Sequence, residues 1–272
     1  MTAKKKFLLV KLLLLLLLTI IYGCAKEDIG TVGSDLLSKA EIIACLEEEG
    51  LQLQKTRAAS PLKEKVAAKP AAFRVSDKGE TLFIYVFDSF TDRKDAFPAI
   101  YTDIVSEDKG PYFIFIAKNA SIIYEPGDDH SVILKTCSKI GETVFHGMHD
   151  INQVTFKGQG DYWAAEIKVL YYEYEWGEGE EQQQESYGRE YFQAKYLGEN
   201  PTEVTDFYFT YSFDEEESRT RTKGIYGSRL DENGTYTDFE AGSYFPREDD
   251  IINMTFEWDG KEEIIELKAI TK

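Results

Sequence analysis

Three histidines are the residues of this chain whose types and spacing first suggest chemistry. The segment 146–150 places His146 and His149 three residues apart with Asp150 directly after, and His130 follows two aspartates. Two imidazoles and a carboxylate form a donor set that zinc accepts at a catalytic site, so these are the candidate metal ligands. The helical His-Glu-x-x-His motif is absent. We expect exposed histidines in a polar interdomain loop, no metal and no cofactor.

Aromatic side chains flank a strongly acidic segment. Residues 173–190 contain seven glutamates against one arginine, and Tyr172, Tyr174, Trp176 and Tyr187 lie in or beside this segment. Such a run predicts a solvated hairpin loop that repels itself and stays mobile. The aromatic residues either decorate a packed face or form an exposed cluster. An exposed cluster can stack on sugar rings or anchor a protein partner, which makes these four the candidate binding residues.

Other motifs carry less chemistry. The acidic turn at 231–234 lacks the alternating aspartates of a calcium loop. There is no Gly-x-Ser-x-Gly elbow, no phosphate-binding glycine loop and no Cys-x-x-Cys pair. The basic run 219–223 alternates at period two, which places three cations on one strand face. That face either protects a sheet edge or docks an anionic cell-wall polymer.

Elements typical of a small α+β domain occupy residues 38–125. Ser38 and Glu41 form a capping box for a helix over 39–49. Strands over 73–75 and 81–87 predict a hairpin, and the second is apolar on both faces, as a central strand would be. A helix over 91–105 and strands over 112–117 and 121–124 complete the unit.

Residues 140–272 show a different pattern. From Val154 onward strand signals recur every 10–15 residues, with turn residues between them. An Asn-Gly turn at 233–234 predicts a hairpin, and Asp259-Gly260 predicts another. The pattern favours an antiparallel β-sandwich of the Ig-like kind, without helices. Together the two regions predict an α+β fold class.

The overall charge excludes some partners. The chain has 272 residues and a formal net charge of −18. At about 150 residues per domain this length suits one large or two small domains. The negative field repels nucleic acid and anionic membrane surfaces, so no nucleic acid partner is expected. Cys45 and Cys137 form either one disulfide or two buried thiols.

The first residues predict export. Lys4, Lys5 and Lys6 precede an apolar stretch over 7–23 that ends in a small residue. A positive start, a short apolar run and a small residue at the cut describe a secretory signal peptide over residues 1–23. The alternative is an uncleaved membrane anchor, for which this interrupted stretch is at the lower length limit.

The end of the leader resembles the lipobox of bacterial lipoproteins. Ile21-Tyr22-Gly23-Cys24 has the aliphatic residue, the glycine and the cysteine of that motif, with Tyr22 at the variable position. The resemblance implies that Cys24 is S-acylated and becomes the new N-terminus. Two acyl chains give stable anchoring. Residues 24–37 would then be a tether.

These observations predict a lipoprotein at the extracytoplasmic face of the cell membrane, similar to surface lipoproteins of Gram-positive bacteria. We expect a non-enzymatic binding or interaction module whose partner is a cell-wall polymer or a surface protein. The alternative function is an extracellular hydrolase with an interdomain, metal-assisted site near His146 and His149.

Overall fold

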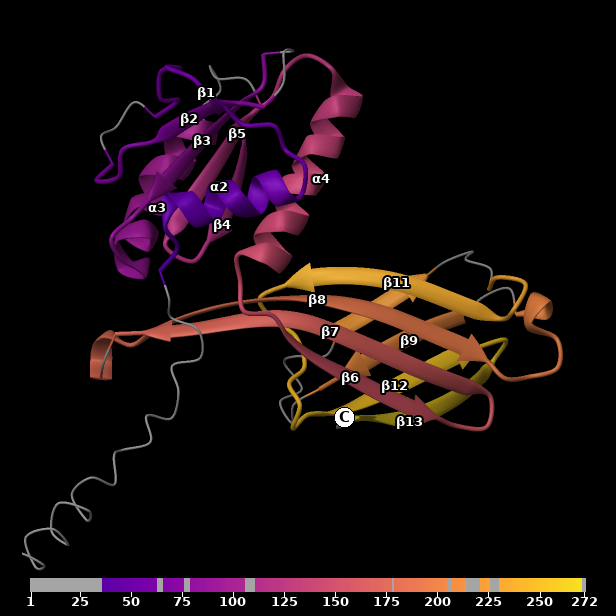
Figure 1. Ribbon diagram of the computed structural model, residues 1–272. Helices are drawn as coiled ribbons and strands as arrows, with labels where there is room; N and C mark the ends of the chain where they lie inside the picture. The colour runs from indigo at the N-terminus through magenta and orange to yellow at the C-terminus, as the bar shows by residue number, and fades with distance from the viewer. Residues whose placement is uncertain are drawn as a thin grey trace, which may run out of the picture.

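The computed structural model describes eight stretches of the chain (Figure 1). They are residues 36–62, 66–75, 79–105, 111–177, 179–204, 207–213, 221–225 and 230–270, with only the backbone at 221–225. The predicted leader, Cys24 and nearly all of the tether lie outside the described residues. So do the side chains of the basic run 219–223.

The first module is a five-stranded sheet with three helices. Its strand order is β1-β2-β3-β5-β4, and every pair of neighbours is antiparallel. Its elements are α2 (Lys39–Glu48), β1 (Gln54–Lys55), β2 (Ala71–Arg74), β3 (Thr81–Val86), α3 (Phe90–Val105), β4 (Phe113–Ala117), β5 (Ala120–Glu125) and α4 (His130–Gly147).

Helices cover both faces of this sheet. Ile42 of α2 and Ile140 of α4 pack with Leu82 on one face. Ile100 of α3 packs with Phe83 on the other face. Strand β3 therefore buries side chains on both sides, which explains its continuous apolar sequence and confirms the predicted central strand. Figure 1 shows α2 and α4 on the opposite side of the sheet from α3.

Local signals account for the ends of two helices. Ser38 accepts a hydrogen bond from the Glu41 amide and Glu41 accepts from the Ser38 amide, so the capping box is confirmed. The helix predicted over 91–105 is confirmed as α3, whose first turn is capped by Ser89 Oγ accepting from the Asp92 amide at 3.0 Å.

Helix α4 was not predicted. Residues 130–147 were expected to include the polar interdomain loop, but they form a helix whose Asp129 side chain accepts from the Ser131 and Val132 amides. Its buried residues include Ile140 and Val144, which pack on the first sheet. Burial of this apolar stripe stabilises a helix where a loop was expected.

The second module is one eight-stranded antiparallel sheet. Its strand order is β10-β9-β12-β13-β6-β7-β8-β11. Its strands are β6 (Asn152–Gln159), β7 (Trp163–Trp176), β8 (Gln183–Tyr196), β9 (Phe207–Ser212), β10 (Arg221–Ile225), β11 (Thr235–Gly242), β12 (Ile251–Trp258) and β13 (Lys261–Ala269), with 3-10 turns η1 (Gly179–Glu181) and η2 (Pro201–Glu203).

This sheet is rolled around its own core. Phe192 of β8 stacks on Phe209 of β9 at 4.4 Å between ring centroids, although these strands are not neighbours in the sheet. Strands β13 and β6 are joined by only two residue pairs among the described residues. Beside this junction a Cβ on Gly158 would lie 2.4 Å from the Glu266 carbonyl oxygen, so only glycine fits there.

The antiparallel β-rich region and the α+β class are confirmed, but the hydrogen bonds do not define two separate sheets. The hairpin predicted at the Asn-Gly turn is wrong: the strand before the turn, β10, pairs with β9, and the strand after it, β11, pairs with β8. The turn itself is present, with Gly234 at φ 75°. The Asp259-Gly260 hairpin between β12 and β13 is confirmed, and both turn residues have positive φ.

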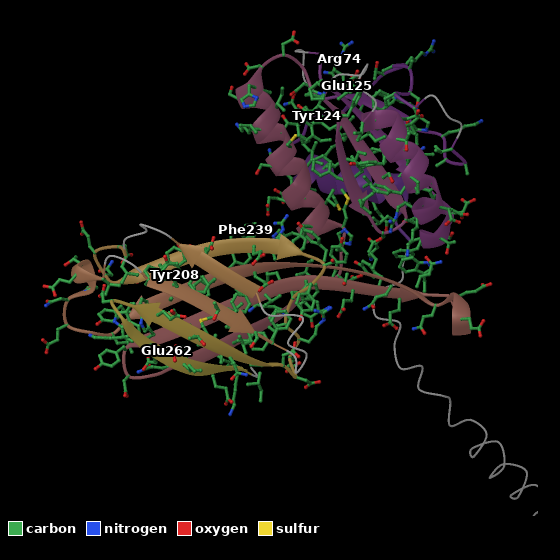
Figure 2. All side chains as sticks on the ribbon, turned by 180° about the vertical axis from the view of Figure 1, so that it is seen from behind. Arg74, Tyr124, Glu125, Tyr208, Phe239 and Glu262 are labelled. Carbon is green, nitrogen blue, oxygen red and sulfur yellow. The ribbon has the colours of Figure 1, made fainter. Side chains whose placement is uncertain are left out.

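Figure 2 shows the two modules from behind. Figure 2 shows Arg74, Tyr124 and Glu125 at the end of the first sheet that lies away from the second module. Tyr208 and Glu262 lie on the second module. Within the described stretches, no helix combines the length and the apolar character needed to cross a bilayer.

Candidate functional site

A projecting hairpin brings the two modules into contact. Strand β6 pairs with β7 as far as Tyr171, and β11 pairs with β8 from Gly188 onward. Among the described residues, 172–176 and 183–187 therefore pair only with each other. We call residues 172–187 the arm. Figure 1 shows the β7–β8 hairpin running beneath the first module.

The tip of the arm is fixed to α3. Trp176 stacks on Phe90 at 5.2 Å between centroids and donates its indole hydrogen to Thr91 Oγ1 at 3.0 Å. Glu185 accepts from the buried Arg93, whose Nε also donates to the Lys118 carbonyl at 2.9 Å. A buried guanidinium needs these partners, so the ion pair holds the arm against the first module.

His149 lies at the centre of the contact. Its ring is 7% exposed and stacks on Tyr172 at 3.7 Å with an angle of 3° between the planes. Nε2 lies 3.2 Å from the Ile116 carbonyl oxygen, and Nδ1 lies 3.1 Å from the Tyr174 hydroxyl. Because a carbonyl only accepts, Nε2 carries the hydrogen and Nδ1 accepts from Tyr174.

The surroundings keep this imidazole neutral. Burial lowers the pKa of His149 to about 4, and the positive charge of Lys118 acts in the same direction. Lys118 is held by Asp150, with 2.8 Å between Nζ and Oδ2. A neutral ring whose two nitrogens both have protein partners has no free position for a metal or a reacting proton. His149 therefore has a structural part in the contact.

An open groove of about 390 Å³ lies beside His149. That volume is within the range of small-ligand sites, roughly 300–1,000 Å³. Strand β4, helix α4 and the β7–β8 hairpin each form one wall. The residues that line it include Ile114, Ile116, Val144, Phe145, Tyr172, Tyr187 and Arg189.

One cation lies at the rim of the groove. The Arg189 guanidinium is 4.0 Å from the centroid of the Phe145 ring and donates to both carboxylate oxygens of Glu142 at 2.8 Å. Its charge is balanced by this pairing. Apolar and aromatic residues make up most of the lining, and the charge of Arg189 is paired.

The predicted metal ligands do not converge. His146 is exposed and lies 3.4 Å from Glu142 on α4, while His149 points into the contact between the modules. Asp150 pairs with Lys118, and His130 begins α4. Among the described residues, no group of three or more histidine, cysteine, aspartate and glutamate side chains is arranged to hold a metal ion. The expectation that all histidines are exposed is wrong for His149.

The candidate aromatic residues separate into two kinds. Tyr172 and Tyr174 are buried in one cluster with Phe90 and Phe145, so they join the modules. Trp176 is half-buried against α3. Tyr187 is 37% exposed and lines the groove. Of the predicted exposed cluster, Tyr187 alone among the described residues has both the exposure and the position for ligand contact.

The acidic segment is not the mobile loop that its composition predicted. It forms the paired strands of the arm and of β8. Glu173 pairs with Arg247, and Glu185 pairs with Arg93. Glu190 is buried and accepts from the Tyr211 hydroxyl at 2.9 Å. Distant cations and hydroxyls offset the local repulsion that the sequence alone shows.

Cys45 and Cys137 are free thiols in the structure, not a disulfide. Cys45 Sγ lies 3.4 Å from the Gly147 carbonyl oxygen, which ties α2 to the end of α4. Burial raises the pKa of Cys137 to about 11 and also raises that of Cys45. Neither has the lowered pKa of a reactive cysteine.

The groove is also lined by residues that were not among the predicted site residues, including Ile114, Phe145 and Arg189. The sequence of α4 does have apolar residues at helical spacing. They recur every three or four residues, at Ile133, Cys137, Ile140 and Val144. That stripe predicts α4, which carries Phe145 into the groove. No local pattern predicts that Arg189 lies opposite.

No protein-family model matches this chain, and no match is found among curated proteins or solved structures. Its chemistry must be inferred from its own residues and their geometry.

Proposed function

We propose that this chain is a lipid-anchored extracytoplasmic protein that acts as a non-enzymatic binding module. The observation that supports binding is the groove between the modules, which has apolar walls of suitable size. Its one histidine is occupied at both ring nitrogens, which favours binding over hydrolysis. The anchor rests on the resemblance of residues 21–24 to a lipobox.

We also propose that the eight-stranded sheet folds into two facing layers, as in an Ig-like sandwich. Strands β10, β9, β12 and β13 would form one layer, and β6, β7, β8 and β11 the other. The ring of Trp163 on β7 lies 4.6 Å from that of Phe256 on β12, as facing layers require.

Metabolic labelling tests the anchor. The full-length chain, expressed in a Gram-positive bacterium with an alkyne analogue of palmitate, should incorporate label. Cys24→Ala should abolish labelling, whereas Cys45→Ala and Cys137→Ala serve as matched controls and should keep it. A labelled Cys24→Ala variant or an unlabelled wild-type protein would overturn the proposed acylation.

Protease treatment of intact cells tests the location. A protease added outside should degrade the folded part of the wild-type protein while a cytoplasmic marker stays intact. Protection of the folded part until the cells are lysed would place it inside and would exclude a surface binding function.

A further inference from the structure

Strand β4 is an edge of the first sheet. It is last in the strand order, and among the described residues it pairs only with β5. The main-chain groups on its outer side are therefore open to a further strand.

The β4–β5 hairpin determines which groups point outward. Ala117 and Ala120 are the pair that closes its two-residue turn, so they exchange main-chain hydrogen bonds, and alternate pairs along the strands do the same. Ile114 and Ile116 fall between these pairs, which directs their N–H and C=O groups outward. The bond from His149 Nε2 to the Ile116 oxygen agrees with this direction.

Within the described part of the chain, three outward groups are left after His149 bonds to the Ile116 carbonyl. They are the N–H and C=O of Ile114 and the N–H of Ile116, and both residues line the groove. One extended residue opposite Ile114 can make two main-chain hydrogen bonds there.

The walls suit the side chains of an extended segment. Val144 and Phe145 of α4 are apolar, and Tyr172 and Tyr187 of the hairpin are aromatic. Among the described residues that line the groove, Arg189 is the one charged side chain, and it is paired with Glu142. The other polar side chains of the lining are His149, whose two ring nitrogens are occupied, and the two tyrosines, whereas a sugar polymer needs more polar partners for its hydroxyls.

We infer that the groove binds an extended peptide segment of a partner protein, which adds to β4 as a sixth strand of the first sheet. The added strand continues the contact between the modules, in which His149, from the segment between α4 and β6, already bonds to this edge. Apolar side chains of the peptide face α4 and the arm, while its backbone pairs with Ile114 and Ile116. This inference rests on the proposed binding function and names its partner class.

A random-peptide display library, selected against the detergent-purified full-length protein, tests the inference. We expect selected peptides with alternating apolar residues. On binding, they should slow amide hydrogen exchange at Ile114 and Ile116, because those hydrogens become bonded. A ligand held by side chains alone would leave these two amides unprotected. This test does not depend on lipidation or location, so its failure is distinguishable from failure of the proposed anchor.

Two variants with matched controls locate the peptide. Tyr187→Ala should weaken binding about tenfold or more, as loss of an aromatic anchor does. Tyr191→Ala removes an equally exposed tyrosine from the same strand outside the groove and should not. Gly141→Leu should block the groove from α4, whereas Gly141→Ala adds a Cβ at an ordinary 3.5 Å from Phe115 and should bind normally.

Four results would overturn the inference. The first is that no peptide is selected, or that selected peptides bind all four variants equally. The second is that N-acetylglucosamine oligomers bind in the groove without protecting the two amides. The third is protection in the free protein that is lost when residues 25–35 are deleted, which would make this chain its own occupant. The fourth is a dimer in sedimentation that Gly141→Leu disrupts.

Discussion

At the scale of single residues, His149 joins the modules only while its ring is neutral. Burial holds its folded-state pKa at about 4, below the ordinary 6.5. As the pH falls the unfolded chain binds the proton first, so the stabilisation is complete above pH 6.5 and is lost between there and pH 4. We predict that the free energy of unfolding drops by about 2 kcal/mol from pH 7 to pH 5, measured by urea denaturation.

A substitution without a titratable group isolates this effect. His149→Gln retains an N–H donor for the Ile116 carbonyl but does not titrate, so most of the dependence on pH should disappear. His146→Gln changes an exposed histidine four residues after Glu142 and should keep the wild-type slope. An unchanged slope in His149→Gln would contradict the assignment.

At the scale of elements, the packing of β8 depends on a glycine. A Cβ on Gly188 would lie 2.4 Å from Cδ1 of the buried Phe245, whose ring is held beneath the Arg247 guanidinium at 3.7 Å. Gly188→Ala should therefore destabilise the protein by about 1–3 kcal/mol, measured by thermal unfolding followed by circular dichroism.

The neighbouring strand supplies the control. Gly242 of β11 pairs directly with Gly188 of β8 in the sheet, and a Cβ there meets no atom within 4 Å. Gly242→Ala should be neutral or slightly stabilising. Equal losses in both variants would mean that β propensity, and not the Phe245 ring, determines the effect.

At the scale of the whole molecule, the contact between the modules should make unfolding cooperative. Arg93 of α3 pairs with Glu185 of the arm, and it is 4% exposed. Arg93→Ala leaves Glu185 without this cation, which costs about 3 kcal/mol for a buried pair. We predict one calorimetric transition for the wild type and two for Arg93→Ala.

Asp95→Ala is the control for that experiment, because Asp95 is exposed on the same helix. It should unfold in one transition like the wild type. A single transition at an unchanged melting temperature in Arg93→Ala would show that the arm does not couple the modules.

The sequence by itself determined the features that depend on neighbouring residues. The Ser38–Glu41 capping box, the apolar strand β3 and the Asp259-Gly260 hairpin were predictable, because backbone propensity and side-chain period act over a few residues. The same short-range signals could have predicted α4. The leader is also a local pattern, and its cleavage and the acylation of Cys24 are still predictions.

Only the tertiary structure decided which distant surfaces meet. The sequence showed self-repelling glutamates at 173–190, but Arg93 and Arg247 lie far from them along the chain and pair with Glu185 and Glu173. The same holds for His149, which is buried because the arm folds back over β4. Long-range burial and charge pairing depend on the positions of whole elements, and the free energy of packing sets those positions after local propensity has formed them.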